Sequence, residues 1–236
     1  MMICKIADLF VDVPAVGDLV SRCQGFLSNE VHGADISIRT ELFRPERWSG
    51  LDENLTVYAE TGAHFAFYLM KHSGLVLHAS AVVYEGKAYL FSANSGTGKS
   101  THTKLWQSIF GPSAVVINDD KPALRYVDDV WYAYGTPWCG KDGINANMKA
   151  PIAGICFLKQ SKQNSIRRLS GAEAIGNIIS QTLRRFSTSD YLDILLCSVE
   201  SLVQNIPVFE LENRPEPEAA LLSYNTMKQA AEEIGL

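Results

Sequence analysis

The sequence predicts an α/β protein with α+β character, in which helices flank a mixed, largely antiparallel sheet. Apolar runs of strand length recur along the chain, separated by short turns, and runs of helix length with one apolar face follow several of them. A glycine-rich segment, Ala93–Thr101, lies between a predicted strand and a predicted helix. The 236 residues suffice for one substantial core, or for a main domain with a small addition.

Residues 1–73 are predicted to form a small N-terminal α+β lead-in packed on a larger domain of residues 74–236. Ile3–Val13 has the apolar content of strands, and Asp35–Arg39 alternates like a half-buried strand. Leu55–Ala59 is predicted as another strand. Thr61 is predicted to cap a mostly buried helix that ends near Gly74.

The larger domain is predicted to begin with a hairpin. Its strands are Leu75–Val83 and Lys87–Ala93, separated by Tyr84-Glu-Gly86, and a helix over Thr101–Phe110 follows before Gly111-Pro112. This arrangement places His78 on the sheet beneath the intervening loop. A packed histidine without a chemical role is the alternative interpretation of that residue.

The loop itself, Ala-Asn-Ser-Gly-Thr-Gly-Lys-Ser-Thr, has the residue types that surround phosphates. Gly96 and Gly98 let successive backbone N–H groups turn inward, and Lys99 adds a positive charge. The hydroxyl of Ser100 can bind Mg²⁺ at the start of a helix whose dipole favours anions. The P-loop (Walker A) pattern G-x-x-x-x-G-K-[ST] is met except at Ala93. We therefore expect Asn94–Thr101 to bind a nucleotide; a glycine-rich turn before an ordinary helix is the alternative.

A second strand delivers two acids. Ala114–Asp120 is apolar until it ends in Asp119 and Asp120. Neighbouring buried carboxylates repel each other, so a metal, Lys99 or a histidine should balance them. Acids at this place in phosphoryl-transfer proteins serve the metal and the nucleophile. Two turn-forming aspartates are the alternative.

Beyond the acids, a second hairpin is predicted from Leu124–Val127 and Val130–Tyr134, with Asp128-Asp129 as its turn. The loop Gly135–Gly143 that follows is rich in glycine and proline, and such loops often shape the mouth of a substrate site. Its candidate substrate-binding residues are Trp138, Lys141 and Asp142. A turn with Trp138 packed on the core is the alternative.

The remainder of the chain alternates strands and helices. We expect a strand over Pro151–Leu158, a helix that opens on the capping box Ser170-Gly-Ala-Glu173 and continues through Arg184 and Arg185 to Phe186, a helix over Tyr191–Val203, a strand over Ile206–Leu211, and a final helix from Pro215. Between the first two, Lys159, Lys162, Arg167 and Arg168 form a basic stretch, for which a solvated face is the simplest interpretation.

Composition limits the partners. A net charge of −5 argues against nucleic acid, and no apolar run approaches the length of a membrane span. The five cysteines are scattered, without a Cys-x-x-Cys pair, which argues against a disulfide framework or a structural zinc site. We expect a cytoplasmic protein with neither nucleic acid nor membrane as a partner.

Taken together, His78, Ser95-Gly-Thr-Gly-Lys-Ser100 and Asn118-Asp-Asp120 resemble motifs of a known family. The resemblance, over roughly Leu75–Leu158, is to the C-terminal catalytic domain of HPr kinase/phosphorylase and, more distantly, to the ATP-binding core of phosphoenolpyruvate carboxykinase. It extends to bacterial proteins of this size that carry His-Ala-Ser-Ala before the loop and Gly-Thr-Pro-Trp after the acids. Some of those accompany peptide-modification systems.

The resemblance implies a function and a role for each matching residue. It implies a kinase that uses ATP and Mg²⁺ and phosphorylates a hydroxyl of a peptide, small protein or metabolite. A serine hydroxyl is the leading candidate. Lys99 would contact the β and γ phosphates, Asp119 would be the general base, and His78 would orient or tune Asp119. Ser100 and Asp120 would serve the metal. The family's kinase forms rings, which leaves room for a homo-oligomer. A catalytically inactive nucleotide sensor, or a phosphatase or phosphorylase using the same site, are the alternatives.

Overall fold

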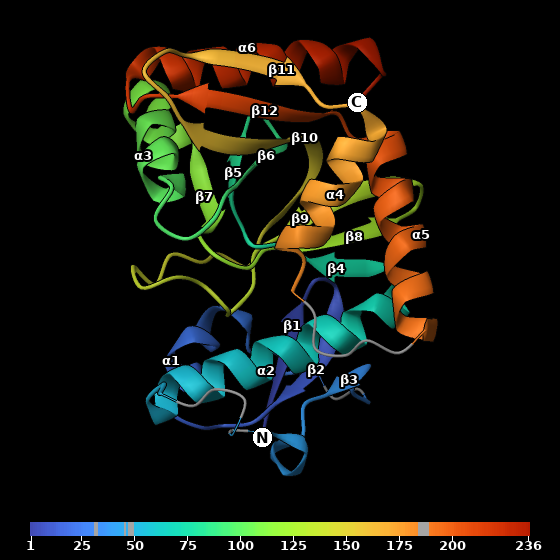
Figure 1. Cartoon of the computed structure of the whole chain (residues 1–236). Helices are drawn as coiled ribbons and strands as arrows, with labels where there is room; N and C mark the ends of the chain where they lie inside the picture. Colours follow the sequence, from blue (N-terminus) through green and yellow to red (C-terminus); the bar gives the residue numbers. More distant parts are fainter. Residues whose placement is uncertain (31–32, 45, 47–49, 184–188) are drawn as a thin grey trace.

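The computed structural model describes residues 1–30, 33–44, 46, 50–183 and 189–236, and it shows a mixed α/β fold (Figure 1). Its strands are β1 (Met2–Ile6), β2 (Leu9–Val13), β3 (Ile36–Ser37), β4 (Gly74–Val76), β5 (Ala79–Tyr84), β6 (Lys87–Ser92), β7 (Val115–Asn118), β8 (Ala123–Val127), β9 (Val130–Tyr134), β10 (Lys149–Gln160), β11 (Ser165–Arg168) and β12 (Val208–Asn213). Its α-helices are α1 (Leu19–Arg22), α2 (Glu53–Leu69), α3 (Lys99–Phe110), α4 (Gly171–Gln181), α5 (Ser189–Asn205) and α6 (Pro217–Glu233).

Over the described residues, the main sheet has nine strands and is mixed but largely antiparallel, as predicted. Its order is β4-β8-β9-β10-β6-β5-β7, and β12 and β11 extend from β10. The long strand β10 joins the two halves: its start pairs antiparallel with β9, and its later residues pair parallel with β6 and β12. The hairpins β5–β6 and β8–β9 are both confirmed.

Helices cover both faces of this sheet because side chains alternate along its central strands. On β6, Leu90 faces the cluster that includes Ile178 of α4 and Val199 of α5, while its neighbours Tyr89 and Phe91 face the cluster of α3 and α6. Figure 1 shows α4 and α5 on one side of the sheet and α3 and α6 on the other. The helix that follows the glycine-rich loop thus packs on the sheet and beside α6.

The N-terminal segment forms the three-stranded sheet β1-β2-β3, packed with α2 at the end of the molecule where β4 lies (Figure 1). One hydrophobic cluster contains residues of both parts: Ile6, Val11 and Phe65 lie in it together with Val76 and Trp138. The division of the chain near residue 73 into a lead-in and a main domain stays a prediction.

The beginning of α2 corrects two expectations. Leu55–Ala59 is helical, not a strand, because α2 begins at Glu53, where the side chain of Asp52 accepts a hydrogen bond of 2.8 Å from the Leu55 N–H. Thr61 lies within the helix instead of capping it, and its hydroxyl donates to the Val57 carbonyl at 2.7 Å. Burial of Phe65 and Leu69 against the N-terminal sheet outweighs the local β propensity.

Four smaller differences separate the observed elements from the predicted ones. The predicted strand Leu75–Val83 divides into β4 and β5, which pair with different neighbours and leave His78 at the break. The basic stretch contains the unpredicted strand β11, whose Arg167 binds Glu210 of β12 at 3.0 Å. The final helix begins at Pro217, not Pro215. Helix α4 has the predicted capping box but ends at Gln181, and Arg184, Arg185 and Phe186 lie outside the described residues.

Within the described part of the chain, no helix combines the length and the apolar character needed to cross a membrane.

Candidate active site

The glycine-rich loop curls tightly between β6 and α3. Gly96 has φ 79° and Gly98 has φ 113°, in the left-handed region that side chains strain to adopt. Helix α3 then begins at Lys99, and the His102 N–H already donates to the Gly98 carbonyl at 2.9 Å. The loop therefore has the curvature that turns successive N–H groups toward one point, as an anion nest requires.

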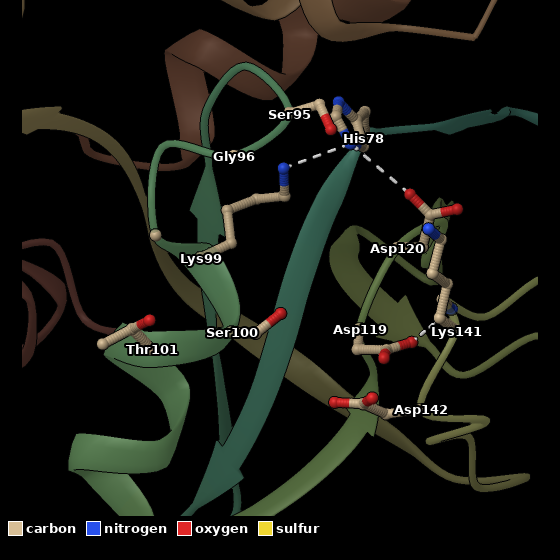
Figure 2. Close-up of a pocket in the computed structure, with 12 residues that line it drawn as sticks. His78, Ser95, Gly96, Lys99, Ser100, Thr101, Asp119, Asp120, Lys141 and Asp142 are labelled. Atoms are coloured by element: carbon tan, nitrogen blue, oxygen red, sulfur yellow. Dashed lines mark hydrogen bonds and ion pairs between the residues drawn. The ribbon is translucent and has the colours of Figure 1, made fainter.

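The loop and the two acids line the same cavity, with a volume of about 520 Å³. Figure 2 shows Lys99 and Ser100 on one side, Asp119, Asp120 and Asp142 on the other, and His78 above both. The full lining is His78, Ser95, Gly96, Gly98, Lys99, Ser100, Thr101, Asp119, Asp120, Gly140, Lys141 and Asp142. Most of the residues predicted for catalysis and phosphate binding are thus brought together.

Lys99 is bound within the protein. Its Nζ lies 3.1 Å from Nε2 of His78 and donates to the Ala93 carbonyl at 2.9 Å. Burial lowers the pKa of Lys99, although the charge of Asp120 acts in the opposite direction. Burial and the charge of Lys99 also lower the pKa of His78, which favours the neutral imidazole. A neutral ring can accept a hydrogen bond from the lysine.

Asp120 is held from three sides. One carboxylate oxygen, Oδ2, accepts hydrogen bonds from the Tyr58 hydroxyl and from Lys121 Nζ, and Oδ1 lies 3.4 Å from Nε2 of His78. Burial alone would raise the pKa of Asp120, but Lys121 and the Tyr58 hydroxyl hold it below its usual value. Asp120 therefore stays ionised, and it is the acid that His78 contacts.

Asp119 has a different environment. Its Oδ1 accepts a hydrogen bond of 2.5 Å from the Gly140 N–H. Burial raises the pKa of Asp119, and the negative charges of Asp120 and Asp142 add to the effect. In Figure 2 the carboxylates of Asp119 and Asp142 lie on the wall opposite Ser100. Two adjacent acids thus have pKa values shifted in opposite directions, as is typical of acid–base pairs with different tasks.

Asn118 fixes the acids relative to the loop of Gly135–Gly143. Its Nδ2 donates to the carbonyls of Thr136 and Trp138 at 3.0 and 3.2 Å, and its Oδ1 accepts from the N–H groups of Asp120 and Lys121 at 2.8 and 2.6 Å. The amide is completely buried. It therefore ties the end of β7 to the segment that supplies Gly140.

The predicted substrate residues separate into two groups. Lys141 and Asp142 are exposed and line the cavity, and Asp142 lies 3.7 Å from Lys104 of α3. Trp138 is not brought to the cavity: it is 1% exposed, stacks on Phe65 with ring centroids 4.6 Å apart, and donates its indole N–H to Thr61 at 3.0 Å. Trp138 is therefore packed on the core, which is the alternative interpretation given for it from the sequence.

Of the remaining loop residues, Asn94 and Thr97 are not among those that line this cavity. Asn94 Oδ1 accepts a hydrogen bond from Gln181 at 3.0 Å. Thr97 lines a second cavity of about 350 Å³ that shares Gly96, Gly98 and Thr101 with the first. This second cavity is bounded by Leu105 of α3 and by residues that follow β10 and β12, namely Ser161, Arg214 and Pro215.

Three side chains that organise the site were not predicted from the sequence: Tyr58, Lys121 and Gln181. Tyr58 is 62 positions from Asp120, in a segment predicted to be a strand, so no local pattern indicated it. Gln181 is 103 positions from His78, at the end of α4. Lys121 follows the acids directly, and this adjacency of a cation was a usable signal.

The residues present fit a bound nucleotide with Mg²⁺. The curled loop suits an anion, and Ser100 Oγ and the opposing acids are the oxygen ligands that Mg²⁺ prefers. Among the residues that the structure describes, no three acids, histidines or cysteines gather to hold a metal by themselves. A magnesium ion here would therefore depend on phosphate oxygens for part of its coordination, as is usual for this cation.

Fold and site together define a mixed α/β protein in which a P-loop motif faces a pair of acids. Residues 55–214 match the family described as SynChlorMet cassette protein ScmC, and the chain belongs to this family. Among solved structures, the Hpr(Ser) kinase/phosphatase from Coxiella burnetii is similar with a TM-score of 0.38 and 10% identity, over 68% of this chain and 99% of that one. At this TM-score the likeness supports no argument about activity. No curated protein matches the chain.

Proposed function

We propose that the protein is a kinase that uses ATP and Mg²⁺ and transfers the γ-phosphoryl group to a hydroxyl of a peptide, small protein or metabolite. A serine hydroxyl is the leading candidate. The observation that carries the proposal is that the curled loop with Lys99 and Ser100 faces Asp119 across one cavity. Phosphoryl transfer requires mainly positioning and neutralisation of charge, which such a cavity supplies.

Each residue has a defined task in this proposal. Loop N–H groups and Lys99 bind the phosphates, and Ser100 and Asp120 serve the metal, which neutralises charge on the phosphates. Asp119 accepts the proton of the attacking hydroxyl. Its raised pKa supports that role, because a carboxyl with a higher pKa is a stronger base. Asp120 Oδ2 is already bound by Tyr58 and Lys121, so the oxygen left to serve the metal is Oδ1, which lies 3.4 Å from Nε2 of His78.

The second cavity is suited to the nucleoside. A triphosphate bound along Gly96–Thr101 with its γ-phosphate toward Asp119 would extend its other end toward the second cavity, which shares Gly96, Gly98 and Thr101 with the first. The 350 Å³ cavity opens there and has an apolar wall at Leu105 and a guanidinium at Arg214. Guanidinium groups stack on flat aromatic rings such as nucleobases.

The acceptor would approach from the rim formed by Lys141, Asp142 and Lys104. The family description names a cassette, so the first acceptors to test are the other products of that cassette. The proposal sets the reaction in the cytoplasm, in keeping with five free cysteines, and includes neither nucleic acid nor a membrane as partner. A homo-oligomer remains compatible with it.

The test is phosphoryl transfer from γ-labelled ATP with Mg²⁺ to these acceptors. Asp119→Asn should lower the transfer rate by about 10²- to 10⁴-fold, the usual contribution of a general base, while ATP binding measured by calorimetry persists. Asp128→Asn, in the exposed turn between β8 and β9, is the matched control, since asparagine tolerates its φ of 49°. Undiminished transfer by Asp119→Asn would remove this residue from the mechanism.

The same assays separate the alternatives. Nucleotide binding without transfer to any acceptor would favour a sensor. Removal of a phosphoryl group from the phosphorylated acceptor, by water or by added phosphate, would favour a phosphatase or phosphorylase.

A further inference from the structure

Four side chains connect the two ends of the phosphate loop through hydrogen bonds. Lys99 Nζ lies 3.1 Å from Nε2 of His78, and Nδ1 of the same ring lies 3.0 Å from Oε1 of Gln181. The Gln181 amide nitrogen Nε2 donates to Oδ1 of Asn94 at 3.0 Å. Because Asn94 and Lys99 both belong to the loop, the chain of contacts closes into a ring that runs through His78 and Gln181.

With a charged Lys99, the donors and acceptors around this ring of contacts can be assigned in only one way, each group donating to the next from Lys99 to Asn94. An ammonium group has three N–H donors and no lone pair, so His78 Nε2 must accept from Lys99. A neutral imidazole that accepts at Nε2 carries its proton on Nδ1, which must donate to Gln181 Oε1. The other end of the glutamine amide is then a donor, and it meets the acceptor oxygen of Asn94.

Gln181 is itself held firmly in place. Its backbone carbonyl accepts a hydrogen bond of 2.8 Å from the His78 N–H, and the adjacent residues Leu77 and Thr182 form a β-bridge. The histidine is fixed from below by Ser92, whose hydroxyl donates to the His78 carbonyl at 2.8 Å. The backbone of Gln181 is therefore hydrogen-bonded to the backbone of His78, and this pairing holds the glutamine side chain next to the imidazole.

We propose that Gln181 is a positioning residue that keeps His78 in the Nδ1–H form, so that its Nε2 lone pair faces Lys99 and the cavity. In the opposite form Nε2–H would point toward the Lys99 ammonium, and its alternative acceptor, Asp120 Oδ1, lies farther away at 3.4 Å. When Lys99 turns to a phosphate, the Nε2 lone pair becomes available inside the cavity. Any effect of Gln181 on the rate of phosphoryl transfer rests on the proposed kinase function, whereas the tautomer of the His78 imidazole does not.

The decisive measurement is the tautomer of His78 in protein labelled with ¹⁵N-histidine, read from long-range ¹H–¹⁵N correlations at a pH where the ring is neutral. His78→Asn identifies the signal. Wild type should show a protonated Nδ1 and an unprotonated Nε2. Gln181→Leu removes the acceptor and should shift the ring toward Nε2–H, whereas Gln181→Glu keeps an acceptor oxygen and should retain Nδ1–H.

Gln204→Leu, on the exposed side of α5, is the matched control and should change nothing. Thermal unfolding of all variants separates a shift of tautomer from a loss of fold. If wild type carries its proton on Nε2, or if Gln181→Leu leaves the tautomer unaltered, the inference is wrong and the proposed kinase function is untouched.

The effect on activity is a separate readout. Gln181→Leu should lower the transfer rate by about tenfold, equivalent to one hydrogen bond, and Gln181→Glu should restore most of it. If wild type shows the expected tautomer but transfers no phosphoryl group, the proposed function falls and the role of Gln181 in setting the ring stands. Equal rates in wild type and Gln181→Leu would overturn its importance for catalysis.

Discussion

Substituting Gly140 by alanine should displace the carboxylate of Asp119, and so lower the rate of phosphoryl transfer, while changing the stability of the fold only slightly. A Cβ atom at residue 140 would lie 2.8 Å from Oδ2 of Asp119 and 3.1 Å from its Cγ, whereas ordinary contacts begin at 3.4 Å. The carboxylate would have to retreat by about 0.6 Å, the difference between 3.4 and 2.8 Å. A misplacement of 1 Å can lower a rate by about 10²-fold, so Gly140→Ala should reduce phosphoryl transfer by about ten- to a hundredfold.

The same change should cost little stability. The atoms that the methyl group meets belong to the end of a short, rotatable side chain, and the loss is about one hydrogen bond, roughly 1 kcal/mol. Transfer from labelled ATP and unfolding in urea are the two assays. Gly176→Ala is the matched control: nothing lies within 4 Å of its Cβ, and on the exposed side of α4 it should stabilise the protein by about 0.5–1 kcal/mol without changing the rate. Wild-type transfer by Gly140→Ala would refute the placement of Asp119.

Three further predictions concern packing, protonation and the loop. Trp138→Ala should lower the free energy of unfolding in urea by about 3–5 kcal/mol, because the indole is fully buried; a loss under 1 kcal/mol would contradict its place in the core. Burial lowers the pKa of His102 to about 4, so the unfolded chain binds a proton below pH 6.5 that the folded chain refuses. Stability should therefore fall by about 2–3 kcal/mol between pH 7 and 4.5, and His102→Gln should remove that part of the slope; an identical slope in the variant would refute this. Gly98→Ala should weaken ATP binding in calorimetry by about tenfold or more, because φ 113° is strained for alanine, and an unchanged affinity would show that this curvature is not needed.

Local patterns predicted the parts of the fold that depend on local chemistry. The hairpins around Gly86 and Asp128-Asp129, and the capping box at Ser170, follow from turn and cap residues that need no distant partner. Helix α2 was predicted poorly at its start because its stability depends on burial against β1–β3, which no local window contains. Strand β11 has only one apolar residue, and its ion pair from Arg167 to Glu210 crosses 43 positions.

The site divides in the same way. The loop Gly96–Ser100 and the acids Asp119 and Asp120 could be found because their chemistry requires several residue types at close spacing. The groups that set the state of those residues come from elsewhere: Tyr58 from α2 and Gln181 from α4. Their spacing is imposed by the sheet, and a single sequence does not reveal which distant side chains a sheet brings together.

The support beneath the phosphate loop is assembled late in biosynthesis. His102 and Trp106 of α3 both bond Ser223 of α6, at 3.1 Å each, and His102 is separated from that serine by 121 positions. A chain still emerging from the ribosome carries the loop long before the helix that braces it. Contacts over such separations form slowly, so binding of nucleotide during translation would report completion of α6 and not synthesis of the loop.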